Sequence, residues 1–292
     1  MDSQLREEPR KSRDYSIAIL GYCQRRGRMA ITDRWTSGVK YEQWMGRWSR
    51  VLAREFLCWL NAPKGLLWLD LCCGSGVVTE AILDSADPAG ITGLDSSSAQ
   101  ISFAREHRAH PKVNFETGDA MTLPFADASF DIAVCGLGLN FIPTPAQGLR
   151  ELRRVVAPGG TIAVYVWDYE LGARFLRMFW DAARAVDSEA AAADQASRFP
   201  MCTKAGLTQL FEQASLQEIA TRPLDIVTRF ESFDDYWEPL MTGQGSAPNY
   251  LASRSGQIQE QIRERLRAGL PANRNGAIEL PARAWAIRGR RP

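Results

Sequence analysis

Short apolar runs alternate with segments of helical periodicity through the middle of the chain. The runs, which we interpret as strands, span residues 66–71, 90–94, 113–116, 130–135 and 161–167; helices are expected at 77–85, 97–108 and 145–156. Buried parallel strands are apolar throughout, and strands that alternate with helices form a sheet covered on both faces. The pattern therefore predicts an α/β fold with a Rossmann-like, doubly wound and mostly parallel sheet.

The pattern changes after Asp168. Helical stretches at about 171–190 and 203–214 precede a strand-like run at 218–230; helices are then expected at 233–241 and 251–267, and a last strand at 277–287. Two late strands that lack a crossover of the earlier kind indicate an antiparallel hairpin at one edge, which completes a seven-stranded sheet. The helices around these strands are expected to form an inserted cap over the ligand-binding face.

The N-terminal segment differs from the rest of the chain. Residues 1–28 carry seven basic and four acidic residues around one short apolar patch, so we expect a disordered extension. The patch is too short, and its flanks are too acidic, for a signal or transit peptide. Recognisable patterning begins just after Met29, which is therefore a second candidate start of the protein.

Helical spacing of apolar residues over residues 40–60 predicts an amphipathic helix that bends near Gly46. The expected organisation follows from these patterns. An extension at 1–28 precedes an N-terminal helix within 29–64, a Rossmann-like core at 65–168, and a cap with the last two strands at 169–292.

The charge balance narrows the expected partners. The chain has 35 basic and 34 acidic residues, whereas nucleic-acid binders carry a basic excess or face, so nucleic acid is not expected.

No apolar run approaches the roughly 18 to 20 residues of a membrane-spanning helix. The six cysteines form no CxxC pair, which favours reduced thiols and a cytoplasmic location. With only two histidines, a histidine-based metal site is not expected.

A glycine loop follows the first predicted strand, in the run LDLCCGSG at residues 69–76. A loop between a strand and a helix is where this fold binds nucleotides, and Gly74 and Gly76 permit a close approach of the backbone. Thr79 stands where the dinucleotide fingerprint has its third glycine. Asp70 precedes the loop, where a carboxylate would repel a pyrophosphate but suits a cationic ligand.

Two more aspartates end the next two strands. Asp95 lies nineteen residues beyond Gly76, where an acidic side chain accepts hydrogen bonds from both ribose hydroxyls, and Asp119 is placed to accept from an adenine amine. Three carboxylates in this order fit an unphosphorylated adenosine with a cationic tail, and fit NAD poorly. Each aspartate alone would equally suit a helix cap or a turn. We interpret Cys72 and Cys73 as packing residues.

These motifs resemble those of class I S-adenosylmethionine-dependent methyltransferases, in the branch of the ubiquinone and menaquinone enzymes. The resemblance covers residues 40–168, and the family loop is usually LDxGCGTG, so Cys72 replaces a glycine. It implies S-adenosylmethionine as cofactor and a small-molecule methyl acceptor as partner. The matching segments are the glycine loop, GLDSS (93–97), GDAMTLPF (118–125), SFDIAVCGLGLNFIP (129–143) and LRELRRVVAPGG (149–160).

The resemblance also implies which positions hold the cofactor. These are Asp70, Gly74, Ser75 and Gly76 for the methionine part, Asp95 and Ser96 for the ribose, Asp119 and Ala120 for the adenine, and Gly136 and Leu137 beside it. The segment YEQWMGRWSR (41–50) is similar to an N-terminal helix of some relatives that folds over the cofactor. Tyr41 or Arg47 is therefore a candidate for the methionine carboxylate, with aromatic packing and a solvated Arg47 as the equal alternative.

Methyl transfer needs an oriented acceptor more than a fixed catalytic constellation, because the sulfonium already activates the methyl group. Near the exit of the fifth strand, Asp168 is the candidate base, with a loop hydrogen bond as its alternative role. Asn140, Trp167 and Tyr169 are candidates for binding the acceptor. An aromatic cap suits an apolar or aromatic acceptor, although the same side chains would also suit the core of the cap.

The family's Asn-Pro-Pro-Tyr signature for amine acceptors is absent, because the corresponding stretch reads GLGLNFIP. The sequence therefore favours O- or C-methylation of a small molecule. Two alternatives stay open: a methyltransferase that acts on protein or RNA, and a cofactor-binding partner subunit without turnover, for which Cys72 is the one hint.

Overall fold

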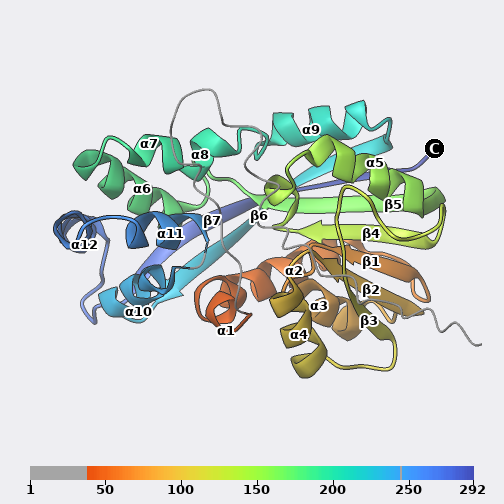
Figure 1. The fold of residues 1–292 in the computed structure, drawn as a ribbon, viewed down its shortest axis with the longest axis horizontal. Helices are drawn as coiled ribbons and strands as arrows, with labels where there is room; N and C mark the ends of the chain where they lie inside the picture. The colour runs from red at the N-terminus through yellow and green to blue at the C-terminus, as the bar shows by residue number, and fades with distance from the viewer. Residues whose placement is uncertain (1–37, 244) are drawn as a thin grey trace, which may run out of the picture.

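The computed structural model describes residues 38–243 and 245–292, so the predicted extension and Met29 lie outside the described residues. Within them, one sheet of seven strands has the order β3-β2-β1-β4-β5-β7-β6 (Figure 1). All neighbours are parallel except β7, which is antiparallel to β5 and β6. The predicted mostly parallel sheet with an antiparallel edge pair is confirmed. The strands are β1 Leu67–Leu71, β2 Gly90–Asp95, β3 Val113–Thr117, β4 Phe130–Gly136, β5 Val156–Trp167, β6 Gln217–Phe230 and β7 Ile278–Arg290.

Helices cover both faces of the sheet. One face carries α2 (Arg47–Leu60), α3 (Val77–Ser85) and α4 (Ser98–His107), and the other carries α5 (Pro145–Val155) and α9 (Lys204–Gln213) (Figure 1). The central strands are buried on both sides, which explains why they read as continuous apolar runs.

The start of β5 differs from the prediction. We expected the strand to begin at Thr161, after the Pro-Gly-Gly turn, but strand geometry begins at Val156. Val156 pairs with Phe130, and Thr161 pairs with Ile132, so the intervening residues bulge out opposite a single residue of β4. Regular pairing does begin at Thr161.

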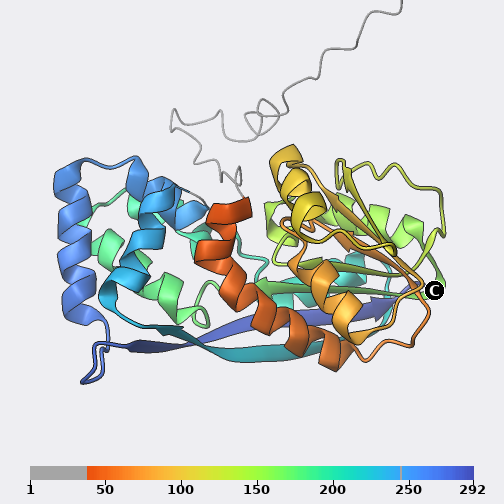
Figure 2. The same cartoon turned by 90° about the horizontal axis from the view of Figure 1, so that it is seen from below.

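The N-terminal helix is broken where the sequence predicted a bend. A short α1 (Gly38–Tyr41) leads into one π-helical turn, η2 (Glu42–Gly46), and then into α2. A Cβ on Gly46 would lie 2.5 Å from Oε2 of Glu42, so glycine lets the Glu42 side chain fold back over the turn. Figure 2 shows this helix running between the core and the cap. Single π-helical turns within α-helices are frequently found at functional sites.

The cap gathers at one end of the sheet, where β6 and β7 extend beyond the other strands (Figures 1 and 2). It is tied together by buried polar contacts: Arg177 pairs with the fully buried Asp194, and the Tyr236 hydroxyl donates to the Phe175 carbonyl at 2.7 Å. Its helices are α6 Arg174–Val186, α7 Ala190–Ala193, α8 Gln195–Arg198, α10 Phe233–Trp237, η4 Glu238–Thr242, α11 Ser246–Ala252 and α12 Gly256–Gly269.

Candidate functional site

The strand order reverses between β1 and β4, and the glycine loop lies at the carboxyl end of β1. Ligands of open α/β sheets bind in the crevice at such a reversal. Gly74 and Gly76 have φ angles of +52° and +82°, and a Cβ on Gly74 would meet no atom within 4 Å. The backbone at Gly74 therefore faces open space, as close contact with a ligand requires. Cys72 also has a positive φ, +56°, so it takes the conformation that the usual glycine would adopt.

Asp70 is fully buried behind this loop. The Thr79 hydroxyl donates to its Oδ2 at 2.7 Å, whereas Oδ1 has no hydrogen-bond partner among the described residues. Burial raises the pKa of Asp70 to about 7. A buried carboxyl with one unsatisfied oxygen is costly unless a ligand or ordered water completes it.

Asp95 holds the glycine loop in place from the end of β2. Its Oδ2 accepts from the Gly74 backbone N–H at 3.0 Å, and its Oδ1 accepts from the Ser97 N–H at 2.8 Å. Partial burial raises the pKa of this carboxyl. Ser97 caps α4, so Asp95 does not act as the cap. Since each carboxylate oxygen has two lone pairs, Asp95 keeps acceptor capacity for a ligand, and Ser96 beside it is exposed.

Asp119 forms a turn after β3. Its Oδ1 accepts from the Met121 backbone N–H at 2.8 Å, which is the turn role offered as its alternative. The side chain is exposed and Ala120 is half-buried. At the end of β4, a Cβ on Gly136 would lie 2.7 Å from the Tyr165 hydroxyl, so only glycine fits there. Leu137 follows with a φ of +58°.

Both candidates in the N-terminal segment, Tyr41 and Arg47, have partners within the protein. The Tyr41 hydroxyl lies 2.8 Å from Oγ of Ser49, and burial raises the pKa of Tyr41 to about 12. Arg47 donates to both carboxylate oxygens of Asp235 in α10 at 3.0 Å and stacks on the ring of Phe230. Arg47 thus joins the N-terminal helix to the cap.

The residue of this segment that does contact the glycine loop is Glu42, which sequence reasoning missed. The Ser75 hydroxyl donates to Oε1 of Glu42 at 2.7 Å. The sequence feature that could have identified Glu42 is that it is the single acidic residue within the 41–50 motif, one turn before Gly46.

Unpartnered polar groups lie beyond β4 and at the end of β5. Asn140 belongs to the short helix η3 (Leu139–Phe141), is 4% exposed, and has no partner for either amide atom within the described part of the chain. Nε1 of Trp167, 2% exposed, likewise has none there. Phe141, which follows Asn140, and Tyr169 both pack against the ring of Phe199.

Asp168 follows Trp167 and is buried, with 8% of its surface exposed. Its Oδ1 accepts from the Leu171 backbone N–H at 3.1 Å, which is the loop hydrogen bond that sequence reasoning offered as its alternative role. The structure therefore places Asp168 at the carboxyl end of β5 with one oxygen engaged in the turn.

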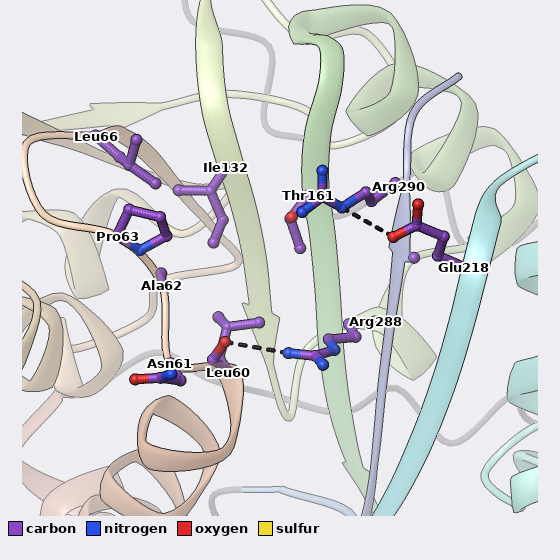
Figure 3. Close-up of a pocket in the computed structure, with 11 residues that line it drawn as sticks. Leu60, Asn61, Ala62, Pro63, Leu66, Ile132, Thr161, Glu218, Arg288 and Arg290 are labelled. Carbon is purple, nitrogen blue, oxygen red and sulfur yellow. Dashed lines mark hydrogen bonds and ion pairs between the residues drawn. The ribbon is translucent and has the colours of Figure 1, made fainter.

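A groove of about 310 Å³ lies at the end of the strands opposite to the glycine loop, and Figure 3 shows the residues that line it. Its lining includes Leu66, just before β1, and Thr161 in β5, so it borders the amino ends of the strands. Arg288 donates to the Leu60 carbonyl, and Arg290 pairs with Glu218. The charged groups of this groove are thus used within the protein, and the groove is remote from the glycine loop.

Among the described residues, no group of three or more histidine, cysteine, aspartate or glutamate side chains is arranged to hold a metal ion. Across those same residues, none of the helices has the length and apolar character needed to cross a bilayer.

Comparison with known proteins identifies a methyltransferase domain in this chain. Residues 69–164 match a family model described as a methyltransferase domain. The chain is 31% identical over 202 residues to demethylmenaquinone methyltransferase of Staphylococcus aureus, a match that spans 65% of this chain and 82% of the relative.

Solved structures show the same fold. Phosphoethanolamine N-methyltransferase 2 of Haemonchus contortus, in complex with S-adenosyl-L-methionine, superposes with a TM-score of 0.55 at 15% identity, over 87% of this chain and 56% of that one. YcgJ of Bacillus subtilis gives a TM-score of 0.53 at 17% identity, over 82% and 97%.

The fold, the family match and the curated relative together define a methyltransferase with a Rossmann-like core. The chain belongs to the class I S-adenosylmethionine-dependent methyltransferases, in the branch of the ubiquinone and menaquinone enzymes.

Proposed function

We propose that this enzyme transfers the methyl group of S-adenosylmethionine to an oxygen or carbon of a small apolar or aromatic molecule. The observation that carries the acceptor part is the pair of buried, unpartnered polar side chains, Asn140 and Trp167, at the carboxyl ends of β4 and β5.

The residues at the glycine loop fit the cofactor that the family implies. The open position at Gly74 admits the methionine part, and the unsatisfied oxygen of Asp70 gives the loop a negative partner for a cationic ligand. In this proposal Gly74, Ser75 and Gly76 hold the methionine part together with Asp70. Asp95 and Ser96 hold the ribose, Asp119 and Ala120 hold the adenine, and Gly136 with Leu137 lines the crevice.

The acceptor part rests on unmet hydrogen-bonding capacity. A buried amide that lacks partners costs about 1–3 kcal/mol for each unsatisfied group, so a bound molecule that completes it gains affinity and orientation. Asn140 offers both a donor and an acceptor, and the Trp167 indole offers a donor. A hydroxyl or enol oxygen, which donates one hydrogen bond and accepts others, matches this set. Tyr169 and Phe199 supply the apolar wall.

The chemistry needs little from the protein beyond placement. When bound, the cofactor supplies a methyl group activated by the positive charge on sulfur. In this proposal Asn140 and Trp167 orient the acceptor oxygen, while the buried surroundings exclude water. Asp168, whose Oδ1 is held by the turn, takes the proton of the acceptor hydroxyl.

A matched panel of acceptors tests the proposal. Aromatic compounds that differ only in a hydroxyl or an amino group would be incubated with the enzyme and labelled cofactor, and the products identified by mass spectrometry. We expect methylation of the hydroxyl or of the adjacent ring carbon. Exclusive N-methylation of the amino partners, or transfer only to protein or RNA, would contradict it.

A further inference from the structure

We propose that Glu42 binds the α-ammonium group at the amino-acid end of the cofactor, with Arg50 beside it to pair with the α-carboxylate. This inference rests on the proposed function, because it assigns the methionine part to the glycine loop.

Glu42 is the point where four elements meet. Its Oε1 accepts from Ser75 in the glycine loop at 2.7 Å and from Nη2 of Arg108, after α4, at 3.2 Å. Its Oε2 pairs with Nη2 of Arg50 in α2. The side chain is only 17% exposed, so these contacts are partly shielded from solvent. The carboxylate of Glu42 is thereby fixed directly against the loop.

The carboxylate retains capacity for one more donor. Two carboxylate oxygens offer about four lone-pair positions, and Ser75, Arg108 and Arg50 occupy three of them. An ammonium group is a compact donor that reaches a single lone pair. The remaining position on Oε2 suits it.

The charges around Glu42 also favour a zwitterion over a simple ion. Glu42 and Glu80 face Arg50 and Arg108, with Nη2 of Arg108 3.4 Å from Glu80 and Nε of Arg50 3.6 Å from it. Two negative and two positive groups balance, so an extra lone charge would be unpaired. An α-amino acid brings one charge of each sign and leaves the cluster neutral. Arg50, with 36% of its side chain exposed, is the more accessible of the two arginines.

The neighbouring residue places this segment near the ribose end as well. Burial chiefly raises the pKa of Tyr41, and the carboxylates of Glu42 and Asp95 add to the rise. Tyr41, which directly precedes the π-helical turn, therefore lies within electrostatic reach of Asp95. Tyr41 contacts Ser49 and Arg47 pairs with Asp235, whereas Glu42, the acidic side chain of η2, contacts the loop through Ser75.

The experiment compares two thioether ligands that differ only in the amino-acid end. S-adenosylhomocysteine carries it and 5′-methylthioadenosine lacks it, and both would be titrated calorimetrically into the wild type, Glu42→Gln and Glu80→Gln. Glu80→Gln disturbs the same arginines, with which Glu80 pairs, whereas the Ser75 hydroxyl donates to Glu42, so Glu80→Gln is the matched control. We expect Glu42→Gln to weaken S-adenosylhomocysteine about ten- to a hundredfold and to leave methylthioadenosine unchanged.

Three outcomes separate the possible failures. Equal weakening of both ligands in Glu42→Gln would show a purely structural role and overturn the inference. Tighter S-adenosylhomocysteine binding in that variant would show that Glu42 obstructs the site, which overturns it too. If neither ligand binds the wild type, the proposed function itself fails.

Discussion

The hydroxyl of Thr79 donates a 2.7 Å hydrogen bond to Oδ2 of Asp70, and both side chains are fully buried behind the glycine loop. Thr79 occupies the position where a dinucleotide fingerprint has its third glycine. The departure from that fingerprint therefore supplies the donor that orients the acidic residue. In the proposed function, this residue pair disfavours a pyrophosphate and suits a cationic ligand.

Asp70 should make the free energy of unfolding decrease as the pH rises from 4 to 7. Its pKa of about 7 in the folded protein exceeds the value near 3.9 of an unfolded chain, so the folded state binds the extra proton between these values. The contribution of this group to stability is fully present below about pH 4 and is lost as the pH rises toward 7. We expect Asp70→Asn to gain stability relative to the wild type over this range, by at most about 4 kcal/mol. Urea unfolding of both proteins at several pH values measures the difference; a difference that is flat from pH 4 to 7 contradicts it.

Substitution of Asn140 should weaken acceptor binding without lowering the stability of the protein. Asn140→Leu removes two unsatisfied buried atoms at similar volume, so the free energy of unfolding should stay constant or rise by about 1 kcal/mol. The value of kcat/KM for the acceptor should fall about tenfold or more, with unchanged cofactor affinity. Thermal unfolding, calorimetry and initial rates on one preparation test all three. Reduced stability with a normal acceptor KM would show that the amide has a structural role only.

Arg47 and Asp235 should behave as one unit. Their ion pair joins α2 to α10 with each side chain about one-third exposed, so either alanine substitution should cost about 1 kcal/mol or less. The double variant should be no less stable than the less stable of the two single variants. If Arg47 also bound the methionine carboxylate, Arg47→Ala would weaken S-adenosylmethionine more than Asp235→Ala does. Equal affinities in the two variants would assign Arg47 to the cap alone.

Much of the fold was predictable because its determinants are local. Apolar runs and glycine positions define β1, β2 and the loop between residues 71 and 77, and their predicted bounds agree with the structure to within a residue or two. The bend at Gly46 was predictable for the same reason, since a glycine interrupts a periodic helix.

The side-chain pairings were not predictable from the sequence. Arg47 and Asp235 are 188 residues apart, and Ser75 and Glu42 are 33 apart, so no local period connects them. These pairs form only once α2 lies between the core and the cap. The missing partners of Asn140 likewise depend on packing from several elements, and no spacing along the chain encodes them.

The most direct test of the account is calorimetric titration of the purified protein with S-adenosylmethionine and, separately, with NAD, repeated on Asp95→Ala. We predict binding of S-adenosylmethionine with a dissociation constant on the order of micromolar, no binding of NAD, and a loss of at least about tenfold in the variant. Asp95 holds the Gly74 amide and faces the proposed ribose site, so its removal should affect both. Binding of NAD, or S-adenosylmethionine affinity unchanged in Asp95→Ala, would contradict the assignment of the cofactor site.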